Sequence, residues 1–257
     1  MSGNWPPLDM HAHVDVTIKP RDLLALRAVV FAASRSLGES EQALDRQQQD
    51  LLTVWGVGVH PGVKEALETF ELDAFKRLLS RTAFVGEVGL DGKAKSRLGL
   101  QQEILGSVLA ELQTSPRITS LHSYGATSEL LELLEAIPIR GAVLHWWLGD
   151  AAATKKALEL GSYFSVNVAN MKNAEALDQV PLDRIFTETD HPDGDRWSPR
   201  PRQPGNVSKV EVELARRRGI EPADVRRAGW ENLRSITEST RSQDLLPPRL
   251  QSILLAV

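Results

Sequence analysis

Residues 83–91 read Ala-Phe-Val-Gly-Glu-Val-Gly-Leu-Asp, an apolar run that contains one carboxylate, Glu87, before it ends at Asp91. A short apolar run of this kind is typical of a buried strand. The next segment, Ser96–Leu112, places apolar side chains at intervals of three and four residues, which is one face of an amphipathic helix. Those side chains are Leu105, Val108, Leu109 and Leu112. A strand followed by such a helix is the unit from which parallel β/α folds are built.

The same alternation of short apolar runs and longer amphipathic segments continues in both directions along the chain. Pro20 precedes Arg21–Arg27, where it suits the first position of a helix. Eight runs in 257 residues match a closed barrel better than an open sheet, because β/α barrels take about 250 residues. We therefore expect an α/β fold with a single β/α (TIM-type) barrel. The predicted strands are Leu8–Val14, Ala28–Ala33, Leu52–Val59, Ala83–Leu90, Arg117–His122, Gly141–Trp146, Tyr163–Val168 and Arg184–Thr189.

The composition is that of an ordinary globular protein, with 42% hydrophobic and 25% charged residues. No apolar stretch reaches the roughly 20 residues of a membrane span, and residues 1–7 lack the pattern of a secretion signal, so we expect a cytoplasmic protein without a membrane partner. Cysteine is absent, so any metal must be held by His, Asp, Glu or water. A net charge of -4 argues against a broad basic surface for duplex nucleic acid but leaves short or frayed ends open.

Two segments interrupt the alternation. Pro192–Gly205 is rich in proline and glycine and follows the last predicted strand, where barrel enzymes often carry a substrate loop; an ordinary surface loop is the alternative. After Thr240 the chain ends in an apolar tail that contains Pro247 and Pro248. We expect residues 1–240 to form the barrel and residues 241–257 to pack on that barrel or on a partner.

Five of the six histidines stand at or just past the carboxyl ends of predicted strands, the end of a β/α barrel that carries the active site. They are His11, His13, His60, His122 and His145. His11 and His13 alternate on one strand, so both rings point to the same side and can share a metal ion. Asp9 and Asp15 have the same parity, and we expect their carboxylates to orient those two rings.

Two carboxylates join the histidines. An unpaired Glu87 would be costly inside an apolar strand, so it needs a cationic partner, either a metal ion or a buried arginine. Asp190 ends the eighth predicted strand, beside the first. The candidate metal ligands are His11, His13, Glu87, His122, His145 and Asp190. Six ligands are too many for one tetrahedral ion and suit two divalent ions, with zinc or manganese favoured by the imidazoles and magnesium possible in a site that also holds water.

In their order along the chain, these motifs resemble the TatD family of metal-dependent deoxyribonucleases, from Asp9 to about Ile236. The matching pieces are Asp9–His13, Gly58–Pro61, Gly86–Asp91, Leu121–Ser123, His145, Glu188–Asp190 and Asn232. The resemblance implies a barrel of the metal-dependent hydrolase kind. It further implies that His11, His13, Glu87 and Asp190 hold one ion, that Glu87, His122 and His145 hold the second, and that His60 contacts substrate or helps to protonate the leaving group.

The chain departs from the family pattern at three places. Tyr124 stands where family members commonly have arginine, Trp146-Trp147 stands where they have a small or aromatic residue, and residues 191–195 replace a proline–aromatic continuation. These departures concern substrate recognition rather than metal binding. In this divergence the chain is similar to the TatD-like component of bacterial anti-phage Qat operons, which predicts a role in antiviral defence.

The resemblance and the ligand set together predict a two-metal hydrolase that cleaves DNA phosphodiester bonds, with Asp190, His60 and Glu87 as catalytic residues and Asp190 as the candidate general base. The same ligands also serve amidohydrolases, lactonases and phosphotriesterases that act on small substrates. A partner-dependent subunit that keeps a metal centre is a third interpretation.

Aromatic and basic side chains supply the candidate substrate contacts. Trp197, and less readily Trp146 and Trp147, could stack on an unpaired base, although such tryptophans more often fill a core. We expect Arg200 and Arg202 to bind phosphates from the Pro192–Gly205 loop, with a solvated face as the alternative. The same choice applies to the other basic residues expected near the mouth of the barrel, Lys93, Lys95, Arg97 and Arg196.

Overall fold

The computed structural model describes residues 5–173, 176–198 and 200–257, without the side chains of Lys95, Ser96, Lys172 and Asn173. Within these residues, eight short strands occupy the eight predicted positions, each within the predicted bounds. They are β1 (Leu8–Ala12), β2 (Val29–Ala32), β3 (Thr53–Trp55), β4 (Phe84–Gly89), β5 (Ile118–His122), β6 (Ala142–Leu144), β7 (Tyr163–Val166) and β8 (Ile185–Thr187). The interpretation of Lys95 as a phosphate contact lies outside the described side chains.

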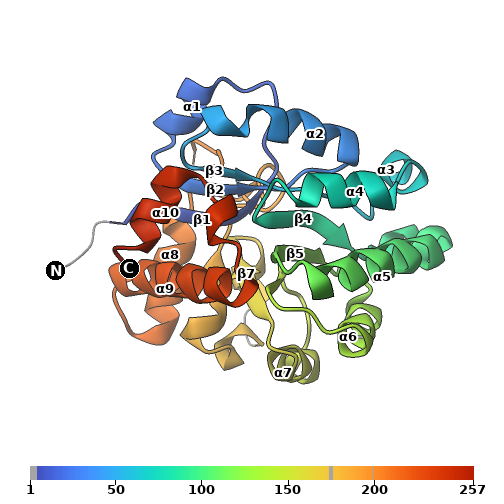
Figure 1. The fold of residues 1–257 in the computed structure, drawn as a ribbon. Coiled ribbons are helices and arrows are strands. Elements are labelled where there is room, and N and C mark those ends of the chain that lie inside the picture. The colour runs from blue at the N-terminus through green and yellow to red at the C-terminus, as the bar shows by residue number, and fades with distance from the viewer. Residues whose placement is uncertain (1–4, 174–175, 199) are drawn as a thin grey trace.

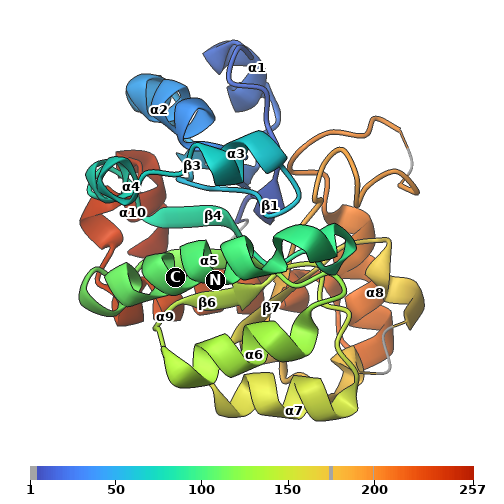
Figure 2. The same cartoon turned by 90° about the vertical axis from the view of Figure 1, so that its right-hand side faces the viewer.

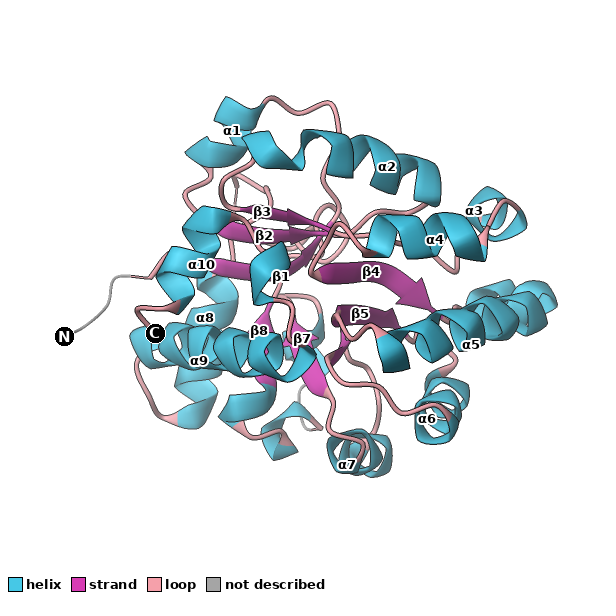
Figure 3. Ribbon diagram, in the orientation of Figure 1, coloured by secondary structure: helices cyan, strands magenta, loops and turns pink. Residues whose placement is uncertain are grey.

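All strand pairs are parallel, in the orders β1-β2-β3 and β4-β5-β6-β7-β8. Backbone hydrogen bonds join the two sheets at both seams. At one seam Gly86 N donates to Val57 O at 3.0 Å, and at the other Asp190 N donates to His11 O at 2.8 Å. The strands therefore form a closed ring surrounded by helices (Figure 3), which confirms the predicted β/α barrel.

Helices cover the outside of the ring (Figure 1). They are α1 (Pro20–Ala25), α2 (Leu37–Arg46), α3 (Lys64–Glu68), α4 (Leu72–Leu79), α5 (Leu98–Thr114), α6 (Thr127–Ala136), α7 (Ala151–Glu159), α8 (Ser208–Arg218) and α9 (Pro222–Thr240). α1 begins at Pro20, and Asp150 caps α7 by accepting from Ala153 N. The apolar face predicted for Ser96–Leu112 is buried in α5, which begins two residues later. None of the described helices has the length and apolar content to cross a bilayer.

The core has two parts. One lies between the strands and the outer helices, and the other fills the amino-terminal end of the barrel, with Phe31, Phe84 and Phe186 packed against Trp230 of α9. The last helix, α10 (Pro248–Leu254), lies on the same side of the barrel as the C-terminus (Figure 1). Its Leu250 and Leu254 are buried in the second part of the core. The predicted domain boundary at residue 240 stays a prediction.

Asn232 connects α9 to the start of β8. Its buried side-chain amide donates to Leu182 O and Ile185 O, both at 2.9 Å. Asn232→Ala is expected to lower the free energy of unfolding by about 2 kcal/mol, because two buried hydrogen bonds of about 1 kcal/mol each are lost. Urea unfolding measures this change. Asn206→Ala is the control, because the side-chain amide of Asn206 donates to Pro201 O in an exposed loop. An equal loss of stability in the two variants would contradict the stabilising role of the buried Asn232 bonds.

The segment after β8 projects from the barrel beside α8 (Figure 2). Its base is fixed by Asp9, whose carboxylate accepts from Thr189 N at 2.8 Å and from Gly205 N at 2.7 Å. Gly205 has a φ of +82°, and a Cβ there would lie 2.5 Å from the Cβ of Ala28, so the close approach requires glycine. The expectation that Asp9 and Asp15 orient the histidine rings is wrong. Asp9 bonds the β8 segment instead, and Asp15 is exposed and accepts from Thr17.

Candidate metal centre

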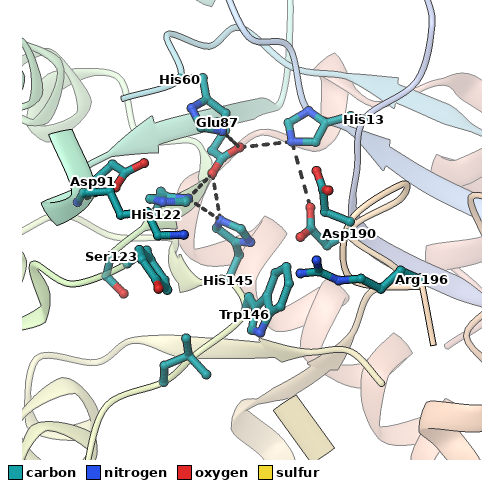
Figure 4. Close-up of a pocket in the computed structure, with 14 residues that line it drawn as sticks. His13, His60, Glu87, Asp91, His122, Ser123, His145, Trp146, Asp190 and Arg196 are labelled. Carbon is teal, nitrogen blue, oxygen red and sulfur yellow. Dashed lines mark hydrogen bonds and ion pairs between the residues drawn. The ribbon is translucent and has the colours of Figure 1, made fainter. Parts of the chain in front are cut away.

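All six candidate metal ligands meet at the carboxyl ends of the strands, around a cavity of about 410 Å³ (Figure 4). The ligands come from β1, β4 and β5 or from the one to three residues that follow β1, β6 and β8. His11 is fully buried beneath the cavity. The residues that line the cavity are His13, His60, Glu87, Asp91, Lys93, His122, Ser123, Tyr124, His145, Trp146, Leu148, Asp190, Asp193 and Arg196.

Glu87 occupies the centre of the cluster and is 1% exposed. Its Oε1 lies 2.5 Å from His122 Nδ1 and 2.8 Å from His145 Nε2. Its Oε2 lies 3.2 Å from His13 Nε2 and 3.3 Å from His60 Nε2. Histidines, rather than a buried arginine, therefore surround this carboxylate, and each of its two oxygens faces a different pair of rings.

Asp190 and the two β1 histidines form the other side of the cluster. Asp190 Oδ1 lies 3.7 Å from His11 Nε2 and 3.9 Å from His13 Nε2. The Nδ1 atoms of the two rings are held from behind, that of His11 by Ser120 Oγ at 2.6 Å and that of His13 by Ala33 O at 3.1 Å. These contacts direct both Nε2 atoms toward the centre, which is the role expected of second partners of metal-binding histidines.

The cluster contains buried polar atoms that form no hydrogen bond with the described residues. His11 Nε2 and Glu87 Oε2 form no hydrogen bond within the described residues, and leaving such atoms unpaired is costly. Three groups of residues bring their ligand atoms within 4.8 Å of one another, namely His11 with His13 and Glu87, His60 with Glu87 and His122, and His11 with His145 and Asp190. The donor set of imidazoles and carboxylates fits zinc or manganese.

The charges in the cluster shift its protonation. Burial raises the pKa of Glu87, but the surrounding histidines outweigh it and hold that pKa well below its usual value. Burial lowers the pKa of His11 and of His60. Burial also opposes the charged form of His145, yet the Glu87 and Glu188 carboxylates raise its pKa well above the ordinary value. For Asp190, burial raises the pKa well above that of an ordinary aspartate.

Glu188 is a further site residue, whose role its sequence motif does not indicate. It is fully buried and accepts from Trp146 N at 2.9 Å, from Asn167 Nδ2 at 2.9 Å and from Ser165 Oγ. Its Oε1 also lies 3.9 Å from His145 Nδ1. Glu188 thus fixes the segment in which Trp146 has a φ of +41°. A carboxylate inside the predicted strand Arg184–Thr189 was the signal that could have identified it.

The predicted substrate contacts separate into two places. Arg200 and Arg202 do not line the metal cavity; they border a shallow surface hollow with Pro201. Arg196 does line the cavity, and Arg202 Nη1 donates to its carbonyl oxygen at 3.1 Å. Trp197 is 60% exposed. Of the two tryptophans after β6, Trp146 lines the cavity, whereas Trp147 is buried and donates to Thr154 Oγ1, so Trp147 fills the core.

A β/α barrel with histidines and carboxylates gathered at the carboxyl ends of its strands defines the chain as a metal-dependent hydrolase. Residues 8–238 match the model of the TatD related DNase family, and the chain belongs to that family. It is 28% identical to the uncharacterized metal-dependent hydrolase YcfH of Escherichia coli K12 over 217 residues. This alignment covers 78% of this chain and 77% of YcfH. The predictions of family, fold and enzyme class are confirmed.

Two further comparisons agree. The 3'-5' ssDNA/RNA exonuclease TatD of Klebsiella pneumoniae is 28% identical over 179 residues, which are 61% of this chain and 64% of that protein. The crystal structure of YJJV, a TatD homologue from Escherichia coli, superposes with a TM-score of 0.79 at 21% identity, over 89% of this chain and 96% of YJJV. The likeness to YJJV supports the same fold.

Metal binding is expected to strengthen as the pH rises. A histidine ligand must be neutral, whereas the raised pKa of His145 keeps this ring protonated above pH 6.5 in the metal-free protein. Below that raised pKa, each unit of pH should increase the metal association constant about tenfold for each proton that the ligands release. Because the folded pKa exceeds the unfolded one, protonated His145 stabilises the metal-free fold below pH 6.5, and this stabilisation is lost as the pH rises through the folded pKa.

Metal titrations by calorimetry at pH 6, 7 and 8, in buffers of different ionisation enthalpy, measure both the affinity and the proton release. Glu188→Gln removes one of the carboxylates that raise the pKa of His145, so its pH dependence should move to lower pH. An affinity that does not change with pH would contradict this account.

Proposed function

We propose that the chain hydrolyses phosphodiester bonds of DNA at a centre of two divalent metal ions, acting on single-stranded or frayed ends. The observation that carries the proposal is the position of Glu87, which belongs to two of the three candidate ligand groups and turns one oxygen toward each side of the cluster. A carboxylate in this position can bridge two ions.

The ligand sets remain those implied by the resemblance. His11, His13, Glu87 and Asp190 would hold one ion, and Glu87, His122 and His145 the second, with zinc, manganese and magnesium as candidates. When bound, the ions would act as Lewis acids and neutralise the charge that develops on the phosphate. One candidate ligand group consists of His60, Glu87 and His122. His60 therefore lies beside two of the residues that would hold the second ion, close enough to contact a phosphate bound there.

Asp190 and His60 have different protonation chemistry. Burial raises the pKa of Asp190, which brings this carboxylate toward the range in which a general base works well at neutral pH. Asp190 would take the proton of the attacking water. Burial lowers the pKa of His60, so its neutral form dominates. A neutral ring favours contact with the substrate over protonation of the leaving group.

The choice of single-stranded or frayed DNA rests on charge and on the relatives. The net charge of -4 disfavours a broad duplex-binding surface. The Klebsiella relative carries the name of a single-strand exonuclease. Phosphate binding by Arg200 and Arg202, base stacking on Trp197, a cytoplasmic location, a role in anti-phage defence and a protein partner on the C-terminal tail stay predictions of the sequence.

A small substrate is the alternative. The cavity of about 410 Å³ falls within the range of small-molecule sites, and the same ligands could hydrolyse a lactone, an amide or a phosphotriester.

One assay separates these functions. The protein is stripped with a chelator, reloaded with zinc, manganese or magnesium, and given single-stranded and duplex DNA with blocked 3′ or 5′ ends, a lactone and a phosphotriester. Cleavage of single strands that needs the metal and is lost in His122→Ala is expected. Turnover of the small substrates together with intact DNA under every metal would overturn the proposal.

A further inference from the structure

Two side-chain cations in the metal cavity have no carboxylate partner among the residues that the structure describes. Lys93 and Arg196 both line the cavity and are exposed. Among the ion pairs of the described residues, neither side chain takes part, whereas other basic residues do, such as Arg46 with Asp50 and Arg226 with Glu211. Their positive charge is therefore available to an anion that enters the cavity.

Each of these cations lies against an aromatic ring. Lys93 Nζ is 4.3 Å from the centroid of the Tyr124 ring, and Arg196 Cζ is 5.8 Å from the centroid of the Trp146 ring. Figure 4 shows Arg196 reaching toward Trp146 at the edge of the histidine cluster. A ring attracts a cation without neutralising its charge. The aromatic contacts thus hold both side chains at the cavity and leave their N–H groups free to donate.

The order of the strands sets the two cations across the cavity from each other. Lys93 follows β4 and Arg196 follows β8. In a closed ring of eight strands these two are four positions apart in either direction, so the residues that follow them lie on opposite sides of the barrel mouth. Glu87 and the histidines lie between the two sides, with Asp91 on one side and Arg196 on the other in Figure 4.

We propose that Lys93 and Arg196 each bind one of the two backbone phosphates that flank the scissile phosphate, so that the substrate strand crosses the cavity from the β4 side to the β8 side. This inference rests on the proposed function and deepens it. A scissile phosphate at the centre leaves its two neighbours on opposite sides, where the two cations stand. Asp91 follows β4 like Lys93, Asp193 follows β8 like Arg196, and both carboxylates line the cavity, so a polyanion binds on either side only through the cation there.

The two cations should depend on different flanking phosphates. A single-stranded substrate with one cleavable linkage is prepared with its two neighbouring linkages either charged or replaced, one at a time, by uncharged methylphosphonate. On the fully charged substrate, Lys93→Gln and Arg196→Gln are each expected to raise KM about tenfold with a smaller change in kcat, because each removes a charge-assisted phosphate contact. The increase in KM caused by Lys93→Gln should vanish when one neighbouring linkage is uncharged. The increase caused by Arg196→Gln should vanish when the other neighbouring linkage is uncharged.

Binding gives a second readout that does not depend on turnover. The slope of log Kd against log salt for a fluorescent single strand, measured by anisotropy with the metal-free protein, should fall by about 0.7 in each variant. Lys155→Gln and Arg234→Gln remove one positive charge each from exposed positions of α7 and α9. These control variants should leave the slope as it is, and an equal fall in them would assign the effect to net charge and overturn the proposal.

The rings offer an independent comparison. Tyr124→Phe keeps the aromatic face under Lys93 and should retain the wild-type affinity, whereas Tyr124→Ala should weaken binding. If a methylphosphonate at either neighbour leaves both cation effects intact, the assignment of Lys93 and Arg196 to flanking phosphates is wrong. If the wild-type protein cleaves no DNA under any metal while the salt slopes fall as expected, the proposed reaction fails and the binding inference stands.

Discussion

Replacing Glu87 by glutamine is expected to reduce hydrolysis roughly a thousandfold and to lower the metal content, because the charge of bound ions is worth several kcal/mol in the transition state and 1.4 kcal/mol is a tenfold change in rate. The amide keeps the size of the side chain but loses the negative charge that faces four histidines. It also turns a hydrogen-bond donor toward rings that need an acceptor, so the cluster loses its common partner.

Elemental analysis and turnover on single-stranded DNA, measured on the same preparation, test this prediction. The melting temperature of the metal-loaded wild type should also exceed that of the variant, since a ligand at 100 times its Kd stabilises the fold by about 2.7 kcal/mol. Glu103→Gln changes an exposed glutamate of α5 and serves as the control. Two ions per chain together with wild-type turnover in Glu87→Gln would exclude the bridging role.

Replacing Asp190 by asparagine is expected to lower kcat by about 10²- to 10⁴-fold, the usual contribution of a general base. Asparagine keeps an oxygen that can ligate an ion but cannot accept a proton. In the wild type, the rate should fall as the pH decreases through the pKa that Asp190 has in the metal-loaded enzyme, because only the ionised carboxylate can act as a base. This acidic limb should be absent from the residual activity of the variant.

The pH profile separates the two roles of Asp190. A loss of rate that added metal fully restores would indicate that Asp190 acts as a ligand alone. Asp193→Asn removes a second carboxylate that lines the cavity but belongs to none of the three candidate ligand groups. Its effect on kcat should be less than tenfold, and an equal loss in both variants would point to the overall charge of the cavity.

The positions of the strands and the convergence of the ligands followed from the sequence because both depend on local patterns. A strand buried on both faces must be apolar, and the carboxyl ends of parallel strands necessarily meet at one end of a barrel. His122 and His145 could therefore be placed in one cavity although they are 23 residues apart.

The partners behind the ligands did not follow from such patterns. Ser120 is 109 residues from His11, and the contact exists only because the barrel closes. The alternation of side chains along β1 suggested that Asp9 orients the ring of His11. Alternation fixes only the side of the strand toward which a residue points, whereas the distance across the barrel decides which groups it contacts. The positions of the basic side chains in the loop after β8 could not be predicted from local patterns either. Arg196, Arg200 and Arg202 share one loop, and the path of that loop decides that Arg196 alone of the three lines the cavity.

The bonds from Asp9 to both ends of the segment between Thr189 and Gly205 have a consequence for how this enzyme can diversify. Both ends of this segment are bonded to the carboxylate of Asp9. The length and composition of the part between them can therefore change without moving the strands that carry the ligands. Lengthening a loop whose ends are already fixed adds only a small entropic cost, about 0.6 kcal/mol for each doubling. Exchange between relatives of the part of this segment that follows Asp190 should therefore transfer substrate range as a module while the hydrolytic centre, Asp190 included, stays intact.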